Sequence, residues 1–276
     1  MTRRSAALLA LVFSAFAAPA PAAQLIGVSF EDGLVYDVDA QTGAASNPRS
    51  FSADSATLTL YAGVEFAAAG SLLLATVQAN AAFPSQLFSA TLGDVGAVSI
   101  GAIGEQVGEG DLALDPLSGD LYAIGLTDLL IPLTLLRIDL PSSTATVVGA
   151  IDFNDVSALA FDAGGTLYAI DADTDALVVL DPTDASTLSN VALSEPLGQL
   201  AGMDFDPATG TLYVADGGTG GADALFTLDP ATGGLTEIGP LGLANGLSGL
   251  AVPEPDAAVL AAAAYLTLAS VALRRR

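Results

Sequence analysis

The chain of 276 residues repeats itself, and this repeat constrains the fold more than any other feature of the sequence. A first motif is found as DLALDPLSGDLYAI (111–124), ALAFDAGGTLYAI (158–170), GMDFDPATGTLYVA (202–215) and, in a degenerate form, GVEFAAAGSLLLA (63–75). A second motif follows each copy, as LFSATLGDVGAVSIG (87–101), LLRIDLPSSTATVVG (135–149), LVVLDPTDASTLSNV (177–191) and LFTLDPATGGLTEIG (225–239). Tyr122, Tyr168 and Tyr213 are 46 and 45 residues apart, so one unit repeated at a regular period is predicted.

Each motif has the composition of two short strands joined by a turn. The strand segments are rich in Val, Ile, Leu, Phe, Tyr and Thr. In the turn Asp-Pro-x-Thr-Gly, the Asp side chain bonds the backbone downstream, Pro presets φ and Gly takes the positive φ. Aspartates stand at seven such strand–turn junctions: Asp39, Asp115, Asp139, Asp162, Asp181, Asp206 and Asp229. Four antiparallel strands in about 45 residues are typical of one blade of a β-propeller.

The two ends of the repeat region predict the number of blades and the closure of the ring. Residues 24–43 align with 166–185, so the first blade begins at its second strand. Residues 248–252 align with 157–161, which is an innermost strand, and no blade follows them. If Gly249–Val252 supplies the missing strand of the first blade, five blades form a ring without an open edge. We therefore expect an all-β, five-bladed propeller, with an open β-solenoid or a β-sandwich as the alternatives.

Equivalent positions in the expected innermost strands support a crowded axis. One column is mostly small: Gly63, Asp111, Ala158, Gly202 and Gly249. Three positions later the column is large and apolar: Phe66, Leu114, Phe161, Phe205 and Val252. Blade faces pack against neighbouring blades, so these aromatic side chains are expected to serve blade packing rather than ligand binding.

The N-terminus has the three parts of a secretory signal peptide. A basic MTRR is followed by the apolar AALLALVFSAFAA and by the small residues PAPAAQ. The Ala20-Pro21-Ala22 pattern places cleavage near Ala22 or Ala23, so residues 1–23 are predicted to be removed. The alternative is an N-terminal membrane anchor that is retained, which the shortness of the apolar run disfavours.

The C-terminal tail, residues 253–276, combines a short motif, an uncharged helix and a basic end. Val252 precedes Pro253, Glu254 and Pro255, residues 257–273 carry no charge, and Arg274, Arg275 and Arg276 end the chain. The apolar stretch is at the lower limit of a transmembrane helix, and the arginines would stay on the cytoplasmic side. The alternative is an unprocessed tail anchor.

These three features, in this order, resemble a PEP-CTERM sorting signal. The resemblance covers about the last 25 residues and implies an exosortase substrate of a Gram-negative bacterium that makes extracellular polysaccharide. It also implies processing at or near Pro253, Glu254 and Pro255. The protein would pass through an inner-membrane intermediate and be delivered to the cell surface or extracellular matrix.

The composition excludes several classes of chemistry. The chain has no Cys and no His, which excludes disulfides, thiolate chemistry, Ser-His-Asp catalysis and His-ligated metals. Residues 24–252 hold 29 acidic residues against Arg49 and Arg137, a net charge of −27, so nucleic acid is not an expected partner. Apart from the seven turn aspartates, these acids lack basic partners and are expected to be solvated or screened by cations.

Two groups of residues are candidates for ligand or metal binding. The loops leading into the innermost strands form an acidic, amide-bearing mouth that suits Ca²⁺, or else a solvated rim: Glu105, Glu109, Asp111, Asn154, Asp155, Glu195, Gln199 and Asn245. The segment Asp171, Asp173 and Asp175 opens like a calcium loop. Ala176 and Pro182 then depart from that pattern, which leaves a polar turn as the alternative. No other cofactor is expected.

The leading functional hypothesis is an exported, non-catalytic binding or structural module in an extracellular polysaccharide or protein matrix. The rival is a hydrolase or lyase that uses carboxylates, with or without Ca²⁺, on extracellular polysaccharide. Paired carboxylates can catalyse glycoside hydrolysis, but with this many acids some pairs will be close by chance. Two close carboxylates in a deep channel, one with a raised pKa, would favour the rival. A shallow mouth with scattered acids would favour the binding module.

Overall fold

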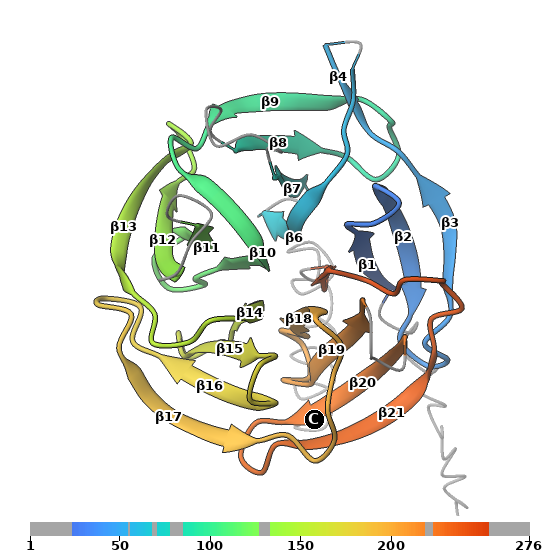
Figure 1. Cartoon of the computed structure of the whole chain (residues 1–276). Helices are drawn as coiled ribbons and strands as arrows, with labels where there is room; N and C mark the ends of the chain where they lie inside the picture. Colours follow the sequence, from blue (N-terminus) through green and yellow to red (C-terminus); the bar gives the residue numbers. More distant parts are fainter. Residues whose placement is uncertain are drawn as a thin grey trace, which may run out of the picture.

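The computed structural model describes residues 24–54, 56–67, 71–77, 85–126, 133–218 and 223–253, and in these segments the chain forms a ring of β-sheets. Five four-stranded antiparallel sheets are arranged like blades around a central axis (Figure 1). The five-bladed propeller predicted from the repeat is therefore confirmed. None of the described segments contains a helix long and apolar enough to cross a membrane.

The strands follow the order of the repeats, from the axis outward in each blade. Blade 1 contains β22 (Gly249–Ala251), β1 (Gln24–Ser29), β2 (Leu34–Asp39) and β3 (Ala45–Arg49). Blade 2 contains β6 (Tyr61–Ala67), β7 (Ser71–Thr76), β8 (Gln86–Ala90) and β9 (Ala97–Ala102). Blade 3 contains β10 (Gln106–Leu114), β11 (Leu121–Leu126), β12 (Leu133–Asp139) and β13 (Thr144–Ala150). Blade 4 contains β14 (Val156–Phe161), β15 (Leu167–Asp171), β16 (Ala176–Leu180) and β17 (Thr187–Ala192). Blade 5 contains β18 (Leu200–Phe205), β19 (Leu212–Gly217), β20 (Ala224–Asp229) and β21 (Gly234–Pro240).

The ring closes by pairing the two ends of the repeat region. β22 is antiparallel to β1, with Gly249 opposite Val28 and Ala251 opposite Ile26. The Ser248 amide also donates to the Val28 carbonyl at 2.8 Å. The predicted closure by the last strand is thus confirmed, and blade 1 is the one blade built from both ends of the described chain.

A small hairpin outside the ring was not expected from the repeat. β4 (Ser52–Ala53) pairs with β5 (Ala56–Thr57) between blades 1 and 2 and projects from the rim (Figure 1). The Ser52 amide donates to the Val95 carbonyl at 2.9 Å, which attaches the hairpin to the turn that precedes β9.

The repeated aspartates form the predicted turns. Each side chain accepts a backbone amide two or three residues downstream, as when Asp206 Oδ1 accepts from Ala208 at 2.8 Å and Asp229 Oδ1 from Ala231 at 2.9 Å. The same bond is made by the other five: Asp39, Asp115, Asp139, Asp162 and Asp181. In the two Asp-Pro-Ala-Thr-Gly turns, Gly210 and Gly233 have φ of 73° and 71°, the region that Gly tolerates without strain.

The hydrophobic core is divided among the contacts between neighbouring blades. Five clusters of buried side chains each combine residues of two adjacent blades. The Tyr122 and Phe161 rings meet edge to face at 5.2 Å between blades 3 and 4, and Tyr168 and Phe205 meet at 5.4 Å between blades 4 and 5. The expectation that aromatic side chains at equivalent positions of the innermost strands serve blade packing is confirmed for Phe161 and Phe205.

The innermost strand of blade 3 departs from the repeat. Only Ile124 separates the pairing partners of Val107 and Leu112, so residues 108–111 bulge where a regular strand has a single residue. Asp111 ends the bulge with a φ of 63°. The two glycines in the bulge, at 108 and 110, allow the backbone to make this excursion toward the axis.

The predicted targeting segments lie outside the described residues. This applies to the signal peptide at 1–23, to Glu254 and Pro255 of the sorting motif, and to the tail helix at 257–273. Pro253 is the last described residue. The domain limits and both sorting signals therefore stay predictions.

Candidate functional site

The wall of the axial channel is formed by the five innermost strands, with two rings of equivalent residues facing the axis. The first ring is Gly63, Asp111, Ala158, Gly202 and Gly249. The second ring, two residues further along each strand, is Glu65, Ala113, Ala160, Asp204 and Ala251. A Cβ on Gly63 would lie 2.5 Å from the Asp111 Cα, so the axis is too crowded for a side chain at every position. Three acids interrupt two rings that are otherwise Gly and Ala.

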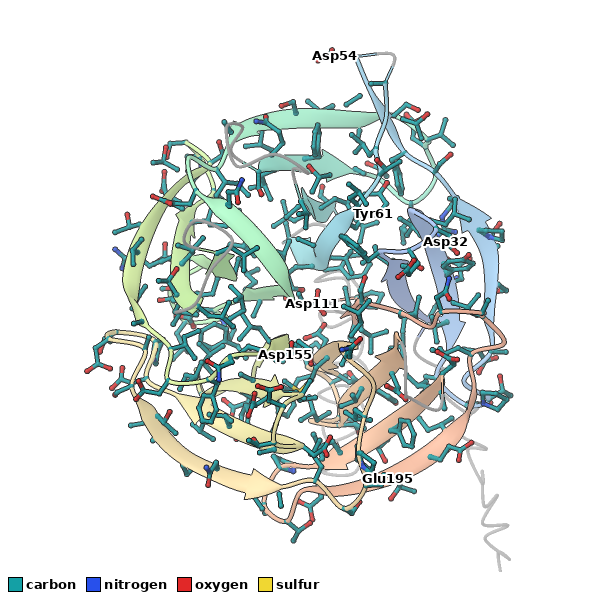
Figure 2. All side chains as sticks on the ribbon, in the orientation of Figure 1. Asp32, Asp54, Tyr61, Asp111, Asp155 and Glu195 are labelled. Carbon is teal, nitrogen blue, oxygen red and sulfur yellow. The ribbon has the colours of Figure 1, made fainter. Side chains whose placement is uncertain are left out.

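Asp111 lies at the centre of the ring (Figure 2) and binds four of the five innermost strands. Its Oδ1 accepts the amides of Val64 and Leu112, each at 2.9 Å. Its Oδ2 accepts the amides of Leu250 at 2.8 Å and Met203 at 3.3 Å. Burial raises the pKa of Asp111 well above its ordinary value, while the four amides oppose this by stabilising the carboxylate.

The predicted place of Asp111 on a loop at the mouth of the channel is wrong. The residue is fully buried, because the bulge of β10 carries it inward. Its four backbone bonds join β6, β10, β18 and β22, so its first role is to hold blades together at the axis. The alignment did place Asp111 in the crowded column, and that part of the prediction is confirmed.

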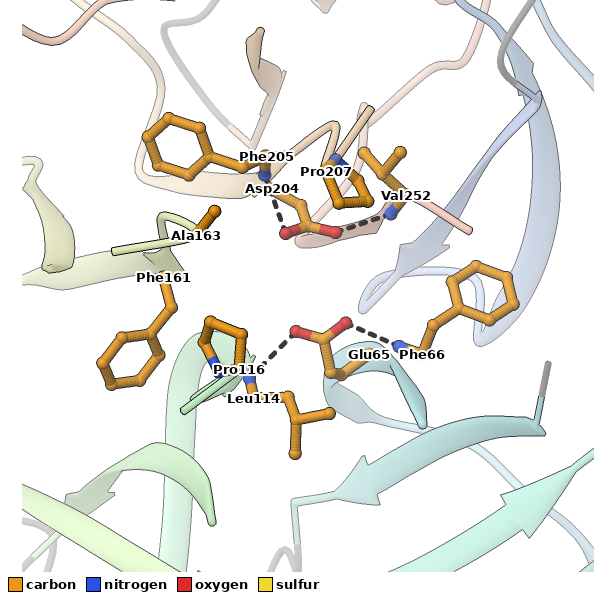
Figure 3. A pocket seen from close by; sticks show the side chains of 10 residues that line it. All are labelled: Glu65, Phe66, Leu114, Pro116, Phe161, Ala163, Asp204, Phe205, Pro207 and Val252. Atoms are coloured by element: carbon orange, nitrogen blue, oxygen red, sulfur yellow. Dashed lines mark hydrogen bonds between the residues drawn. The ribbon is translucent and has the colours of Figure 1, made fainter. Parts of the chain in front are cut away.

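The channel has two ends, which we name after the innermost strands. The N-mouth lies where these strands begin, and the C-mouth lies where they end. At the C-mouth, the carboxylates of Glu65 and Asp204 face one another across a cavity (Figure 3). They come from blades 2 and 5, which are not neighbours in sequence order. The pair lies one ring further along the axis than Asp111.

Each carboxylate at the C-mouth accepts two backbone amides. Glu65 Oε1 accepts from Phe66 at 2.6 Å, and its Oε2 accepts from Leu114 of blade 3 at 3.0 Å. Asp204 Oδ1 accepts from Phe205 at 2.7 Å, and its Oδ2 accepts from Val252 of blade 1 at 2.6 Å. Each acid therefore bridges its own blade to the next one.

Burial is the main cause of the altered pKa of Glu65. The Glu65 side chain is 7% exposed and Asp204 is 8% exposed. Burial and the nearby Asp204 raise the pKa of Glu65 well above its ordinary value, and the amides of Phe66 and Leu114 act in the opposite direction. Two like charges in a buried site favour one proton or one cation between them.

The cavity between these carboxylates is small, and every blade contributes to it. Its volume is about 160 Å³. Beside the two acids, its walls are apolar: Phe66, Leu114, Pro116, Phe161, Ala163, Phe205, Pro207 and Val252. Sites for drug-sized ligands are roughly 300–1,000 Å³, so this pocket accommodates only a small chemical group.

The loop residues predicted at the mouth lie at the N-mouth, away from this pocket. Asn154, Gln199 and Asn245 are exposed, and Asp155 is half-buried. Glu105 and Glu195 are also exposed, and the side chain of Glu109 lies outside the described part. None of these residues lines the pocket at the C-mouth, and whether they bind a ligand stays a prediction.

The segment predicted as a calcium loop forms a turn between β15 and β16. Asp171 is buried and accepts the Thr174 hydroxyl, Asp173 is exposed, and Asp175 has a φ of 48°. No group of three or more acidic side chains in the described residues is placed to hold a metal ion. Calcium binding by Asp171, Asp173 and Asp175 together stays a prediction that the geometry does not favour.

The expectation that the remaining acids are solvated is wrong for five of them. Glu65, Asp111, Asp171, Asp204 and Asp216 are each at least nine-tenths buried. Backbone amides take the place of the absent basic residues, as the bonds to Asp111 show, and Asp216 Oδ1 likewise accepts the Gly198 amide at 2.6 Å. An amide lining can stabilise a buried carboxylate without a counter-ion.

Glu65 and Asp204 were not predicted as site residues, although the repeat contains a signal that points to them. In the ring to which they belong, the other three positions are Ala113, Ala160 and Ala251. An acid at a position where the other repeats have Ala breaks the pattern of the repeat. Comparing the repeats column by column would have singled out both residues.

The ring of five sheets around this channel defines the protein as a five-bladed β-propeller. Its sequence matches a family described as a repeat of unknown function (DUF6923) over residues 74–251, and the chain belongs to that family. The matched region runs from β7 to β22, so it covers most of the ring. No curated protein sequence matches the chain.

Many solved structures are similar to this chain. A crystal structure of a nidogen/laminin complex aligns with a TM-score of 0.50 at 16% identity, covering 76% of this chain and 75% of that one. A protein of unknown function from Bacteroides caccae aligns with a TM-score of 0.44 at 13% identity, covering 79% and 73%. At 16% identity, the first likeness bears on the fold alone.

Proposed function

We propose that the protein is an exported, non-catalytic binding module that captures a primary ammonium group at its C-mouth. The observation that carries the proposal is the facing pair Glu65 and Asp204 at a small pocket to which all five blades contribute. The group recognised is the end of a lysine side chain on a partner protein.

The pocket matches an alkyl-ammonium group in charge, donors and shape. An ammonium has three donors and no acceptor, and the two carboxylates that line the pocket are acceptors. The walls formed by Leu114, Pro116 and Val252 suit the apolar stem of a lysine. The volume of about 160 Å³ excludes much larger ligands.

The charge of the domain supports a basic partner. Residues 24–252 contain 29 acidic residues and two arginines. Both arginines are already paired, Arg49 with Asp37 at 2.6 Å and Arg137 with Asp120 at 3.7 Å. The field of such a surface attracts cationic proteins and repels polyanions, which favours a protein partner over an acidic polysaccharide.

The proposal includes delivery to the outside of the cell. Residues 1–23 have the composition of a signal peptide, and the tail from Pro253 to Arg276 resembles a PEP-CTERM signal. An exosortase-type enzyme would process the tail after an inner-membrane intermediate. The domain would then act as a binding or structural module at the cell surface or in the matrix. Normal surface delivery of a variant with Pro253, Glu254 and Pro255 replaced by Ala would contradict this route.

Calorimetry with lysine analogues tests the pocket directly. We expect Nα-acetyl-lysine amide to bind the purified protein and the Nε-acetylated analogue, which lacks the charge, not to bind. Glu65→Gln and Asp204→Asn should each weaken binding at least tenfold, while Glu237→Gln, an exposed acid on β21, should leave it unchanged. Equal binding of both analogues, or equal effects of all three variants, would sink the proposal.

A carboxylate-dependent hydrolase is the second candidate, because one observation favours it. The C-mouth has two carboxylates facing one another, and the pKa of Glu65 is raised, which suits a general acid. Reducing-end release from extracellular polysaccharides, lost in both Glu65→Gln and Asp204→Asn, would support it. The size of the cavity argues against it, since a polysaccharide chain needs an open cleft on both sides of the cleaved bond.

A further inference from the structure

The N-mouth of blade 4 contains two buried oxygen atoms without a hydrogen-bond partner. They are Asp171 Oδ1, in a residue 1% exposed, and Ser157 Oγ, in a residue 2% exposed. An unpartnered buried carboxylate oxygen costs free energy, because its hydration is lost and nothing replaces it. Buried polar atoms of this kind call for a partner from outside the protein chain, such as a water molecule or an ion.

The two oxygens come from neighbouring strands at the same level of the blade. Asp171 ends β15 and is the pairing partner of Val156, the first residue of β14. Ser157 is the bulge residue that follows, since Ala158 already pairs with Ile170. The bulge therefore places the hydroxyl of Ser157 beside the end of the strand that carries Asp171.

Asp155 supplies a second carboxylate at the N-mouth of blade 4. The Asp155 carbonyl accepts the Ala172 amide at 2.8 Å, which fixes the loop before β14 against the residue that follows Asp171. Asp155 lies on the axial side of blade 4 (Figure 2). Asp155 is half-buried and directly precedes Val156, the pairing partner of Asp171, so the two acids lie at the same end of blade 4.

Blade 5 shows how the same position is satisfied when no ligand is needed. Asp216 is the structural equivalent of Asp171, because Ala215 pairs with Gly202 as Ile170 pairs with Ala158. Asp216 Oδ1 accepts the Gly198 amide at 2.6 Å from the loop leading into β18. In blade 4 the corresponding loop instead contributes an acid, Asp155.

We propose that blade 4 binds one Ca²⁺ at the N-mouth, held by the carboxylates of Asp171 and Asp155 and by the hydroxyl of Ser157. Hard oxygen donors suit Ca²⁺, and the two negative charges match its charge, since the arginines of the described residues pair with Asp37 and Asp120 instead. Three protein ligands leave the rest of the coordination sphere to water. The dissociation constant is therefore expected to be in the weak range of extracellular calcium modules, about 10⁻⁴–10⁻³ M.

Calcium calorimetry and thermal unfolding of the purified protein test this site. We expect one Ca²⁺ per chain and a melting temperature that rises by roughly 2–6 °C at saturating Ca²⁺. Asp171→Asn and Ser157→Ala should weaken Ca²⁺ binding at least tenfold and remove most of the thermal response. Asp171→Asn should still fold, because the replacement keeps the shape of the side chain.

Two control variants separate this site from the general acidity of the domain. Asp216→Asn changes the equivalent position of blade 5, and Asp152→Asn removes an exposed charge from the loop before Asp155. Both should bind Ca²⁺ like the unchanged protein. The proposal is overturned if the unchanged protein shows no Ca²⁺ response, or if Asp171→Asn and Asp152→Asn respond alike. Retention of lysine-analogue binding in Asp171→Asn would show that the site at the C-mouth is independent of this one.

Discussion

The two mouths of the channel are formed by opposite ends of the same five strands, yet the hydrogen bonding of buried polar groups differs between them. At the C-mouth, every oxygen of Glu65 and Asp204 accepts a backbone amide. At the N-mouth, Asp171 Oδ1, Ser157 Oγ and Gln106 Nε2 are buried without a partner in the described structure. The strands are regular toward the C-mouth, whereas β6, β10 and β14 carry bulges near the N-mouth.

This difference shows what a regular ring of strands provides. Where the innermost strands keep their register, amides of neighbouring blades lie at the same level, and one carboxylate can join two of them, as Glu65 and Asp204 do. Where a bulge shifts the register, the result depends on where the side chain is carried: the β10 bulge brings Asp111 to four amides at the axis, whereas the β14 bulge leaves the Ser157 hydroxyl buried without a partner. A regular backbone thus stabilises acids by itself, and a bulge can either add to this or leave a polar group to a ligand.

Deleting Gly249–Val252 should have the largest effect, because this segment takes part in both mouths. The deletion removes β22, and with it the amides that Asp111 and Asp204 accept from Leu250 and Val252. We expect loss of cooperative unfolding in urea, monitored by circular dichroism. As a control, deleting the β4–β5 hairpin, which lies outside the ring, should preserve a single transition. Unchanged unfolding after the first deletion would contradict closure by β22.

Asp111→Ala should destabilise the ring by about 3–5 kcal/mol, since it leaves four buried amides without an acceptor. Asp111→Asn keeps one carbonyl oxygen and should recover part of this loss. Urea denaturation of the three proteins measures both differences. A loss below 1 kcal/mol in Asp111→Ala would mean that the axis relaxes around the gap, and that the carboxylate is not a main link between blades.

The smallest expected effect is the contribution of Glu65 to the pH dependence of folding stability. Because its pKa is raised in the folded protein, the folded state binds more protons than the unfolded chain above pH 4.5, so this residue lowers stability as pH rises from there. Glu65→Gln cannot titrate. The stability of the variant relative to the unchanged protein should therefore improve as the pH rises from 4 to 8.

Urea denaturation across this pH range measures the relative stability, with Glu237→Gln as the control for the loss of one exposed charge. A constant difference between Glu65→Gln and the unchanged protein would show that Glu65 has the same pKa in both states. The difference in stability between the two proteins would then come from hydrogen bonding alone, without a contribution from the charge of Glu65.

The fold was largely predictable from the sequence, because a propeller is a repeated local structure. The Asp-Pro-Ala-Thr-Gly turns and the 45-residue period report strand pairs whose hydrogen bonds lie within one blade. The closure was predictable as well, since the alignment assigned Gly249–Val252 to the innermost column. The β4–β5 hairpin belongs to no repeat and left no such pattern.

The site was less predictable, because it depends on departures from the repeat. The inward turn of Asp111 requires the bulge at 108–111, which an alignment without gaps conceals. The pairing of Glu65 with Asp204 requires knowing which blades face one another across the axis. Residue type alone cannot separate a buried acid that accepts amides from an exposed one, as the contrast between Asp111 and Asp173 shows.

The pairing of β22 with β1 also has a consequence for the order in which the chain can fold. The hydrogen bond from Ser248 to Val28 joins residues 220 positions apart. Blades 2 to 5 are each continuous in sequence and can form as the chain emerges, but blade 1 must wait until Gly249 and its neighbours are available. Until then the N-terminal sheet keeps an unpaired inner edge, open to pairing with other chains. In a chain exported N-terminus first, the ring would thus stay incomplete during translocation. The final residues of the domain would close it by pairing with β1.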